Sequence, residues 1–383
     1  MALHFTKDEF KKRKSNILSS MKEQNLEALL MFRQESMYWL TGYDTFGYVF
    51  FQTLILDLKG NVILLTRAPD LRQAQNTSNI KDIRIWIDKD NSNPTDDLKI
   101  ILDELNIKGK KVGVEYEAYG MTGRNALKLN KSLENYCEVV DHSELVTKHR
   151  VIKSTEEIIY VKRAAELADN ALDEVWKHTK AGASEAKILA EMQKVIFEGG
   201  GDYPANEFII GSGHNALLCR YQAEKRSLSN TDQLSIEWAG TYKHYHSALF
   251  RTILIGKTNP KHIKMYEACF EALTSCEENL IPGKTAGYVF DVHAKTFDDL
   301  NYNSARMNAC GYSLGSTFSP NWMDWPMLYT GNPYVIQPGN VFFMHMILMD
   351  SDSGLAMNLG ETYLVTENGN ERLGKQKLDL VVL

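Results

Sequence analysis

The stretch SIEWAGTYKHYHSALFRT, residues 235–252, contains the most informative residues of this 383-residue chain. Two apolar segments, 233–239 and 246–256, predict two strands, because short apolar runs bounded by turn residues are typical of buried strands. Glu237 lies in the middle of the first strand. A carboxylate in such a place is costly to bury unless it is paired or used in chemistry. The stretch therefore predicts a strand pair that carries either a functional acid or an ion-paired core acid.

A triplet of polar aromatic residues follows the turn that we expect near Gly240. The triplet consists of His244, Tyr245 and His246. On an alternating strand, His244 and His246 point to one face and Tyr245 to the other. Counted from Glu237 without a change of register, odd-numbered residues share its face, but a turn near Gly240 leaves the register open. We expect His246 to be a polar residue of a pocket, with a surface or core position as the alternative.

The rest of the second half combines strands with amphipathic helices. Ser154 and Glu157 form a capping box that opens one helix, and glycines 199–201 end the next. Further strands are expected at 207–211, 341–348 and 361–366, and further helices near 184–198, 260–279 and 286–300. The pattern predicts two helix pairs wrapped on a curved antiparallel sheet.

The first half predicts a separate α/β domain, because strands alternate with helices along it. Strands are expected at 28–32, 49–56, 61–66, 111–115 and 137–141, and helices at 6–25, 95–107 and 122–133. A chain of this length suits two domains. We place them at residues 1–150 and 151–383.

Composition excludes several classes of function. With 49 acidic and 43 basic residues, the chain has a net charge of −6 and offers no basic field for nucleic acid. No run of 18 apolar residues is present, so we expect no membrane span. Five cysteines without a CxxC spacing argue against a disulfide framework and a zinc ribbon. Since the start also lacks a signal-peptide pattern, we expect a cytoplasmic protein.

Several motifs resemble the creatinase/prolidase, or pita-bread, superfamily. They are residues 40–44, 112–115, 235–252, 311–315, 338–342 and 361–367, and they follow the order expected along nearly the whole chain. The resemblance implies an α/β N-terminal domain and an α+β pita-bread catalytic domain. It also implies a homodimer in which the N-terminal domain of one chain caps the pocket of the other and contributes Phe46.

The resemblance further implies that the metal-binding residues of the family are replaced. Peptidases of this fold hold two metal ions with two aspartates, one histidine and two glutamates. Those five positions match Glu237, Ala248, Tyr312, His345 and Gly360. Alanine and glycine offer no side-chain ligand, and two hard cations need a dense set of oxygen ligands. We therefore expect no metal and no other cofactor, with a single zinc or iron held by Glu237, His345 and Glu361 as the alternative.

Residues 200–205, 245–247 and 311–322 resemble ectoine hydrolases, with creatinases as neighbours. Creatine carries a guanidinium group and ectoine a cyclic amidinium group. Metal ions would repel such cations, whereas bare carboxylates attract and orient them. The resemblance thus implies metal-independent hydrolysis of a non-peptide C–N bond in a small zwitterionic compound. The alternatives are an Xaa-Pro dipeptidase with an unusual metal site and a catalytically silent, dimeric osmolyte-binding protein.

The expected catalytic residues are two acids and two histidines. Glu237, with Glu361 nearby, is the nucleophile or the base that activates water. The leaving nitrogen takes its proton from His345 or from His214, which lies where creatinase-like motifs carry an acid/base histidine. Each of these residues also has a structural alternative, and for His214 it is an exposed loop position.

The expected substrate-binding residues are a cation, a histidine and several aromatic residues. Arg220 suits a substrate carboxylate, although a solvent-facing arginine is the alternative. Aromatic faces suit a cationic ring, although aromatic residues are also common in cores. The expected set is Arg220, His246, Phe250, Tyr312, Trp322 and Phe46.

Overall fold

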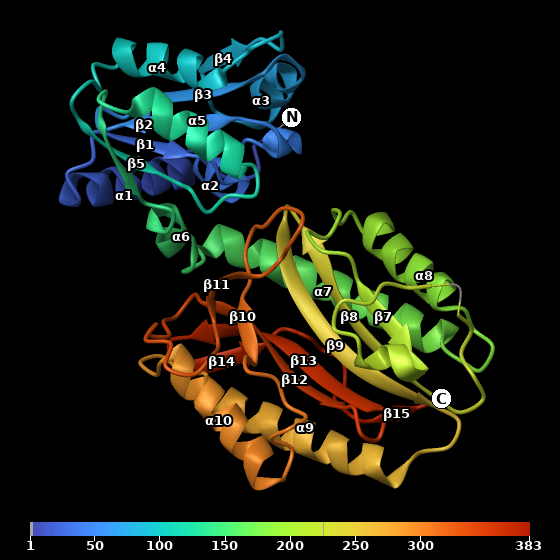
Figure 1. The fold of residues 1–383 in the computed structure, drawn as a ribbon. Coiled ribbons are helices and arrows are strands. Elements are labelled where there is room, and N and C mark those ends of the chain that lie inside the picture. Colours follow the sequence, from blue (N-terminus) through green and yellow to red (C-terminus); the bar gives the residue numbers. More distant parts are fainter. Residues whose placement is uncertain (1–2, 225) are drawn as a thin grey trace. The chain divides into compact units, whose positions relative to one another are not determined.

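The computed structural model describes residues 3–224 and 226–383, and the chain divides into two compact units, Met1–Arg150 and Val151–Leu383 (Figure 1). Each unit has its own sheet and its own hydrophobic core. Within the described residues, no helix combines the length and the apolar character needed to cross a bilayer.

The first unit is an α/β domain, as expected from its alternating pattern. Its described residues form a six-stranded mixed sheet in the order β4-β3-β2-β1-β5-β6. The strands are β1 (Ala28–Met31), β2 (Thr53–Asp57), β3 (Val62–Arg67), β4 (Asp82–Trp86), β5 (Lys111–Val114) and β6 (Glu138–Asp141). The helices are α1 (Lys7–Glu23), α2 (Gln34–Thr41), α3 (Leu71–Thr77), α4 (Pro94–Glu104), α5 (Gly123–Leu133) and α6 (Leu145–Arg150).

Several elements of this unit differ from the sequence prediction, and the short helices α2, α3 and α6 were not predicted. The strand expected from residue 49 begins only at Thr53, because Gly47–Val49 forms the short 3₁₀ helix η1. Strand β4, at the edge of the sheet, was not predicted either, and its first four residues are only half-buried.

The second unit has the pita-bread architecture that the resemblance implied. Its strands follow the path β11-β10-β12-β13-β9-β8-β7, while β14 pairs with β13 and β15 with β9. The strands are β7 (Ile209–Ser212), β8 (Asp232–Tyr242), β9 (Tyr245–Ile255), β10 (Gly311–Ser313), β11 (Asp324–Met327), β12 (Val341–Asp350), β13 (Leu355–Thr366), β14 (Gly369–Arg372) and β15 (Val381–Val382). The helices are α7 (Thr155–His178), α8 (Glu185–Glu198), α9 (Pro260–Asn279) and α10 (Ala286–Asp299).

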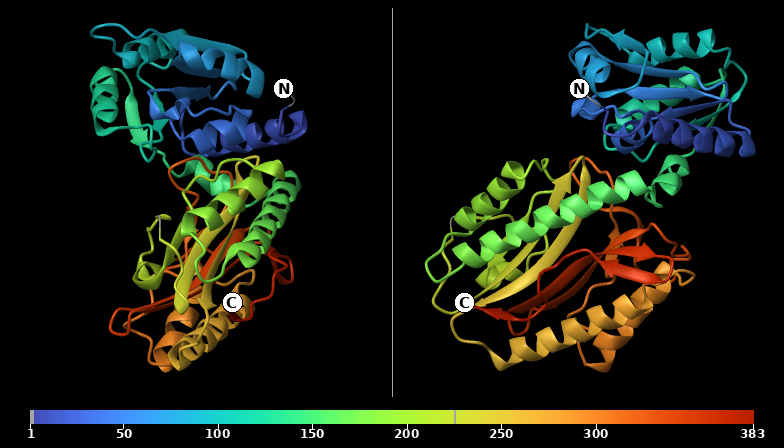
Figure 2. Two further views of the ribbon diagram at one scale, coloured as in Figure 1. Left: turned by 90° about the vertical axis from the view of Figure 1, so that its right-hand side faces the viewer. Right: turned by 180° about the vertical axis from the view of Figure 1, so that it is seen from behind.

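Both helix pairs cover the same face of this sheet. Figure 2 shows α7 crossing β8 and β9, and α9 running beside β12 and β13. Trp238 of β8 donates a hydrogen bond from Nε1 to the carbonyl oxygen of Ala168 in α7, at 3.0 Å. On β12, Phe342 and Met344 pack in the core cluster that includes residues of α9 and α10. Even-numbered residues of both strands thus face helices, which leaves odd-numbered residues on the opposite face.

The hairpin between β8 and β9 corrects the expected turn. The turn residues are Lys243 and His244, whose φ angles of 51° and 62° suit a two-residue hairpin loop. Gly240 lies inside β8, where a Cβ atom would be 2.0 Å from the carbonyl oxygen of Ala164, so glycine there permits close packing of α7. His244 is consequently a turn residue, not a strand residue as expected.

Candidate active site

Four residues form a row across the strands of the second unit, on the face away from the helices. Glu237 of β8 lies opposite Phe250 of β9, Phe250 opposite Gly360 of β13, and Gly360 opposite His345 of β12. Directly opposite residues on paired strands place their side chains on the same face. The row therefore brings Glu237 and His345 to one surface of the sheet, together with Phe250.

Strand β10 adds Tyr312 to this row. The ring centroids of Tyr312, Phe343 and His345 lie 5.4–5.6 Å from one another. Tyr312 Oη donates a hydrogen bond to Glu237 Oε1 at 3.1 Å. Trp322 Nε1 in turn donates to Tyr312 Oη at 2.8 Å. The expected residues Phe250, Tyr312 and Trp322 are thus gathered around the acid, with Trp322 behind Tyr312.

Glu237 is a buried carboxyl group with an unusually high pKa. Its side chain is 7% exposed. Burial raises the pKa of Glu237 to about 7, and the opposing effects of the Tyr312 hydrogen bond and the Arg220 charge do not cancel this rise. Both protonation states of Glu237 are therefore populated near neutral pH, as suits a general base.

His345 is a neutral imidazole at neutral pH. Burial lowers its pKa to about 4, and the positive charge of Arg220 acts in the same direction. Its Nδ1 is buried and has no hydrogen-bond partner among the described residues. His345 therefore enters any reaction as a neutral group with one N–H and one lone pair.

Arg220 supplies positive charge to the site from an exposed position. Its charge acts on the pKa of Glu237, Tyr312 and His345. The guanidinium group donates to the carbonyl oxygen of Cys219 at 3.0 Å. Arg220 follows the 3₁₀ helix η3 (Gly213–Leu217) in the connection between β7 and β8.

A buried acid that the sequence prediction missed anchors this connection. Glu185, in the first turn of α8, accepts hydrogen bonds from the backbone N–H groups of Ser212 at 2.8 Å and Glu224 at 3.2 Å. These two residues bracket His214 and Arg220 in the chain. A glutamate at a helix start is usually solvated, so nothing in the local sequence marks Glu185 as an anchor.

His214 lies on η3 with an exposed side chain. In the described part of the chain its ring makes no hydrogen bond, and its role as a proton donor stays a prediction. Phe46 belongs to the first unit, where its side chain is 75% exposed.

Glu361 does not lie beside Glu237, and that expectation is wrong. Glu361 follows Gly360 on β13, and adjacent residues of a strand point to opposite faces. Its carboxylate forms an ion pair with Arg251, and the two side chains are 0% and 4% exposed. Arg251 Nη1 also donates to the carbonyl oxygens of Phe250 and Gly360, at 2.9 and 2.8 Å. The structure therefore gives Glu361 a structural ion pair.

His246 shares the face of Glu237 but has a structural task. The two-residue turn pairs Thr241 with His246, so even-numbered residues of β9 share the face of odd-numbered residues of β8. His246 Nε2 accepts from the backbone N–H of Ala205 at 3.0 Å, and Nδ1 lies 3.2 Å from Thr317 Oγ1. Burial lowers the pKa of His246 to about 3, so the ring is neutral. Both nitrogens are occupied, which leaves none for the substrate contact that we expected.

The residues at the family's metal positions do not fit a metal centre. A Cβ atom at Gly360 would lie 2.8 Å from Phe343 Cζ and 2.9 Å from Phe250 Cβ, so aromatic rings fill the space of a missing ligand. Ala248 has no ligand atom, and Tyr312 Oη is engaged by Trp322 and Glu237. The single-ion alternative fails as well, because Glu361 faces the other side of the sheet.

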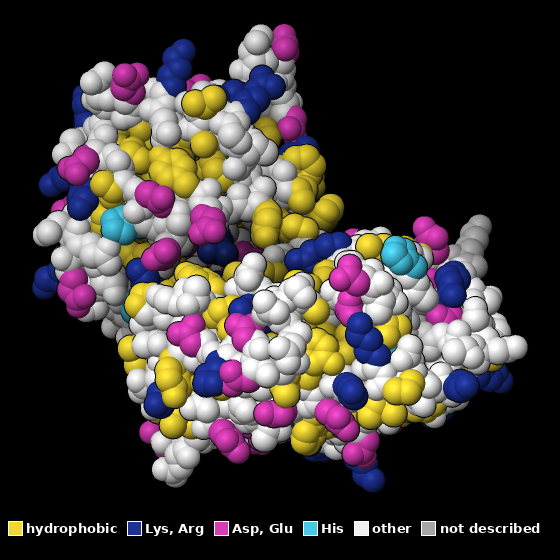
Figure 3. Space-filling view, turned by 60° about the horizontal axis from the view of Figure 1, so that its bottom comes forward, with side chains coloured by type: hydrophobic (Ala, Val, Ile, Leu, Met, Phe, Trp, Pro, Cys, Tyr) yellow, Lys and Arg dark blue, Asp and Glu magenta, His cyan; other side chains and the backbone are white. Residues whose placement is uncertain are grey.

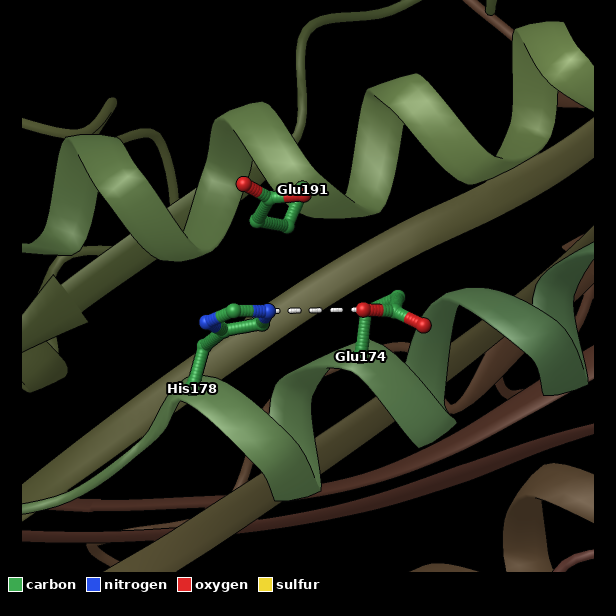
Figure 4. Close-up of side chains that lie close together, drawn as sticks. All are labelled: Glu174, His178 and Glu191. Carbon is green, nitrogen blue, oxygen red and sulfur yellow. Dashed lines mark ion pairs between the residues drawn. The ribbon is translucent and has the colours of Figure 1, made fainter.

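A group with metal-ligand geometry occurs elsewhere, between α7 and α8. It comprises Glu174, His178 and Glu191 (Figure 4), with 3.4 Å between His178 Nε2 and Glu174 Oε2. Hydrogen bonds from Lys177 and Lys187 lower the pKa values of Glu174 and Glu191, respectively. These lysines already balance the carboxylate charges, so the group is a set of ordinary helix-surface ion pairs. Acidic and basic side chains are similarly interspersed on the molecular face that Figure 3 draws.

We expect purified protein to hold no stoichiometric transition metal at the row, because the resemblance matches Ala248 and Gly360, which have no ligand atoms, to two of the five ligands. Elemental analysis after dialysis measures this, and treatment with a chelator should leave activity unchanged. Two ions per chain, together with activity that is lost on chelation and restored by metal, would contradict the expectation.

Comparisons with known proteins agree with this architecture. The sequence model of metallopeptidase family M24 matches residues 160–367, and that of the creatinase/prolidase N-terminal domain matches residues 13–152. Ectoine hydrolase of Halomonas elongata is 25% identical, over 97% of this chain and 97% of that protein. An Xaa-Pro dipeptidase of Pyrococcus horikoshii is also 25% identical, over 95% of this chain and 97% of that protein. Equal identity to the two relatives does not separate their substrates.

Solved structures show the same fold. A prolidase from Thermococcus sibiricus superposes with a TM-score of 0.87 at 20% sequence identity, covering 98% of this chain and 99% of that one. An Xaa-Pro dipeptidase from Bacillus anthracis gives a TM-score of 0.85 at 20% identity. Together with the family matches, these findings identify the chain as a hydrolase of metallopeptidase family M24, with a creatinase/prolidase N-terminal domain.

Proposed function

We propose that this hydrolase opens a non-peptide C–N bond of a small zwitterionic amidine or guanidino compound, ectoine or a creatine-like compound, without a metal ion. The observation that supports the proposal is the row itself. It presents a buried carboxyl group, Glu237, at the position that the resemblance matches to the family's first metal-binding aspartate, and the side chains of Phe250 and Phe343 beside Gly360.

The row suits a planar cation that carries a carboxylate. Glu237 attracts a delocalised positive charge, and the faces of Phe250, Phe343 and Tyr312 add favourable contacts with such a group. Arg220 suits the carboxylate of the same molecule, because a guanidinium group binds a carboxylate in a bidentate manner. A dipeptide that needs two metal ions to polarise its amide bond finds no equivalent of them here.

The chemistry assigned to Glu237 requires its ionised form. The carboxylate either attacks the amidine carbon directly or takes a proton from water, whose oxygen then bonds to that carbon. The C–N bond breaks and the leaving nitrogen takes up a proton. When water is the nucleophile, Glu237 returns the proton that it took from water. When Glu237 attacks directly, a water molecule supplies that proton, and its hydroxide then cleaves the bond between Glu237 and the carbon, which restores the carboxylate. Neutral His345 on the same face can relay this proton through its two ring nitrogens. A bound cation also stabilises ionised Glu237, so binding of substrate itself prepares the base.

A panel of compounds tests the proposal. The protein is incubated with ectoine, hydroxyectoine, creatine and a set of Xaa-Pro dipeptides, and ring opening or product release is followed by NMR. Hydrolysis of at least one of the first three compounds, with intact dipeptides, is the expected result. Cleavage of the dipeptides alone would overturn the proposal. Calorimetric binding of an osmolyte without turnover would favour the binding-protein alternative.

The rate should decrease on the acid side of neutral pH. The pKa of Glu237 is raised to about 7, so the carboxyl group is protonated and inactive below that pH and ionised above it. We expect kcat/KM to fall tenfold per pH unit below the midpoint. The midpoint for kcat should lie lower, because the bound cation favours the ionised form. A kcat/KM midpoint near the ordinary glutamate value would contradict this assignment.

We also propose that two copies of the chain form a homodimer in which Phe46 contributes to the site of the partner subunit. The highly exposed Phe46 side chain supports this proposal. Light scattering should give twice the chain mass. Phe46→Ala should raise KM more than it lowers kcat, and a monomeric mass for fully active protein would contradict the proposal.

A further inference from the structure

A chain of two hydrogen bonds links Trp322 to Glu237. Trp322 Nε1 donates to Tyr312 Oη at 2.8 Å, and Tyr312 Oη donates to Glu237 Oε1 at 3.1 Å. An indole N–H is a donor only, whereas a phenol has a single proton to donate. Because Tyr312 Oη must accept from Trp322, its own proton is directed to Glu237.

The first donor of the chain is held rigidly. Trp322 is buried, and its ring lies 6.5 Å from that of Phe208 and 6.3 Å from that of His246, measured between centroids. Its carbonyl oxygen accepts from Thr317 Oγ1 at 3.4 Å, and Thr317 also contacts His246. An indole packed in this way keeps its N–H pointing in one direction. Tyr312 therefore cannot turn its proton away from Glu237 without losing a buried hydrogen bond.

The two oxygens of Glu237 are consequently not equivalent. Oε1 accepts from Tyr312, while no described residue donates a hydrogen bond to Oε2. We propose that Trp322 is a positioning residue which, through Tyr312, holds Glu237 with Oε1 engaged and Oε2 presented to the substrate. The inference rests on the proposed role of Glu237 in the reaction, although the hydrogen-bond chain can be tested without any substrate.

Few other ionisable groups act on Glu237. The charge of Arg220 lowers the pKa of Glu237, and the pKa of Cys219 is raised, chiefly by burial and also by Glu237. His345, which lies beside Tyr312, has a pKa lowered to about 4. On the Trp322 side, His246 has a pKa lowered to about 3, and the charges of His244 and Asp324 act on it. A response near pH 7 is therefore assigned to Glu237 by its disappearance in Glu237→Gln.

The chain predicts a signal at the Trp322 indole. The protein has six tryptophans, so a ¹⁵N-labelled sample gives six indole N–H resonances, of which Trp322→Phe removes one. In the wild-type protein we expect that resonance to move with a midpoint at about pH 7. In Glu237→Gln and in Tyr312→Phe the movement should disappear. A Trp322 resonance that does not respond to pH in the wild-type protein would overturn the inference.

Trp238 offers a matched control for activity. It is a buried tryptophan whose Nε1 donates to the carbonyl oxygen of Ala168 at 3.0 Å, on the opposite face of the sheet. Trp322→Phe should move the acid limb of kcat/KM to higher pH by roughly one unit, the equivalent of one weakened hydrogen bond to the ionised carboxylate. Trp238→Phe also removes a buried indole and should leave the acid limb of the kcat/KM profile in place. Equal behaviour of the two variants would refute the positioning role.

The two tests separate the inference from the proposed function. If the Trp322→Phe protein fails to fold, Tyr312→Phe provides the same comparison, because it removes the donor to Glu237 Oε1 directly. An indole resonance that follows Glu237, in a protein that hydrolyses none of the proposed compounds, would leave the hydrogen-bond chain intact and contradict the proposed substrate. A Trp322 resonance that does not respond to pH, in a protein that hydrolyses one of the proposed compounds, would contradict the hydrogen-bond chain and leave the proposed substrate intact.

Discussion

Replacement of Glu237 by glutamine is expected to lower kcat/KM by at least about a hundredfold, the usual effect of losing a general base or nucleophile. The amide has nearly the same shape as the carboxyl group, and its oxygen can still accept the Tyr312 hydrogen bond. It can neither attack an amidine carbon nor take a proton from water. The loss should appear with every compound that the wild-type protein hydrolyses.

The stability of this variant distinguishes a catalytic acid from a structural one. The folded-state pKa of Glu237 is raised to about 7 from an ordinary value of 4.5. Folding therefore favours the protonated carboxyl group, and its contribution to stability is lost as the pH rises from about 4.5 through 7. Above pH 7 the glutamine variant should be at least as stable as the wild type in thermal unfolding. Two outcomes would assign Glu237 a structural role instead. One is a variant that is inactive because it is unfolded, and the other is a variant that is folded and still active.

Replacement of Glu361 by alanine is expected to lower the free energy of unfolding by about 3–5 kcal/mol, the range for breaking a buried ion pair. The substitution leaves the charge of Arg251 buried without its carboxylate. Arg251 also donates hydrogen bonds to the backbone carbonyl oxygens of Phe250 in β9 and Gly360 in β13. The pairing of these two strands beneath the row should therefore weaken. Urea denaturation measures the effect.

An exposed ion pair of the same unit serves as the control. Lys162 and Glu371 form an ion pair at 2.8 Å, with side chains 46% and 47% exposed. Glu371→Ala should cost less than about 1 kcal/mol, because water screens exposed pairs. Removing both partners, as in Arg251→Met with Glu361→Leu, should recover part of the loss. A decrease below about 1 kcal/mol for Glu361→Ala would show that this pair is no more important than a surface pair.

Much of the fold could be predicted because its signals are local. The capping box at Ser154 and Glu157 appears as expected, with Glu157 Oε2 accepting from the Ser154 N–H at 2.9 Å. The long amphipathic helices and apolar strands of the second unit were recognisable from periodicity alone. The match of Ala248 and Gly360 to metal ligands of the family is implied by the resemblance and stays a prediction.

The side of the sheet that each residue faces could not be predicted in the same way. The turn lies at Lys243 and His244 and not near Gly240, because α7 packs against the backbone of Gly240 and needs a glycine there. A shift of one residue in such a turn reverses the faces of a whole strand. By the same alternation, Glu361 and Gly360 are adjacent in sequence but face opposite sides of the sheet.

The sequence by itself determined that this chain has an α/β unit and a second unit of helices on an antiparallel sheet, and that the latter carries a carboxyl group in an apolar strand. These properties depend on residue identity and on short-range periodicity, whereas the pita-bread fold and the match of Ala248 and Gly360 to metal ligands came from the family resemblance. Only the tertiary structure decided that Glu237, Tyr312 and His345 share one face, that Glu361 is paired with Arg251 on the other, and that Trp322 donates a hydrogen bond to Tyr312. Such contacts join residues far apart in the chain, and they exist only because strand register and core packing fix which side chains meet.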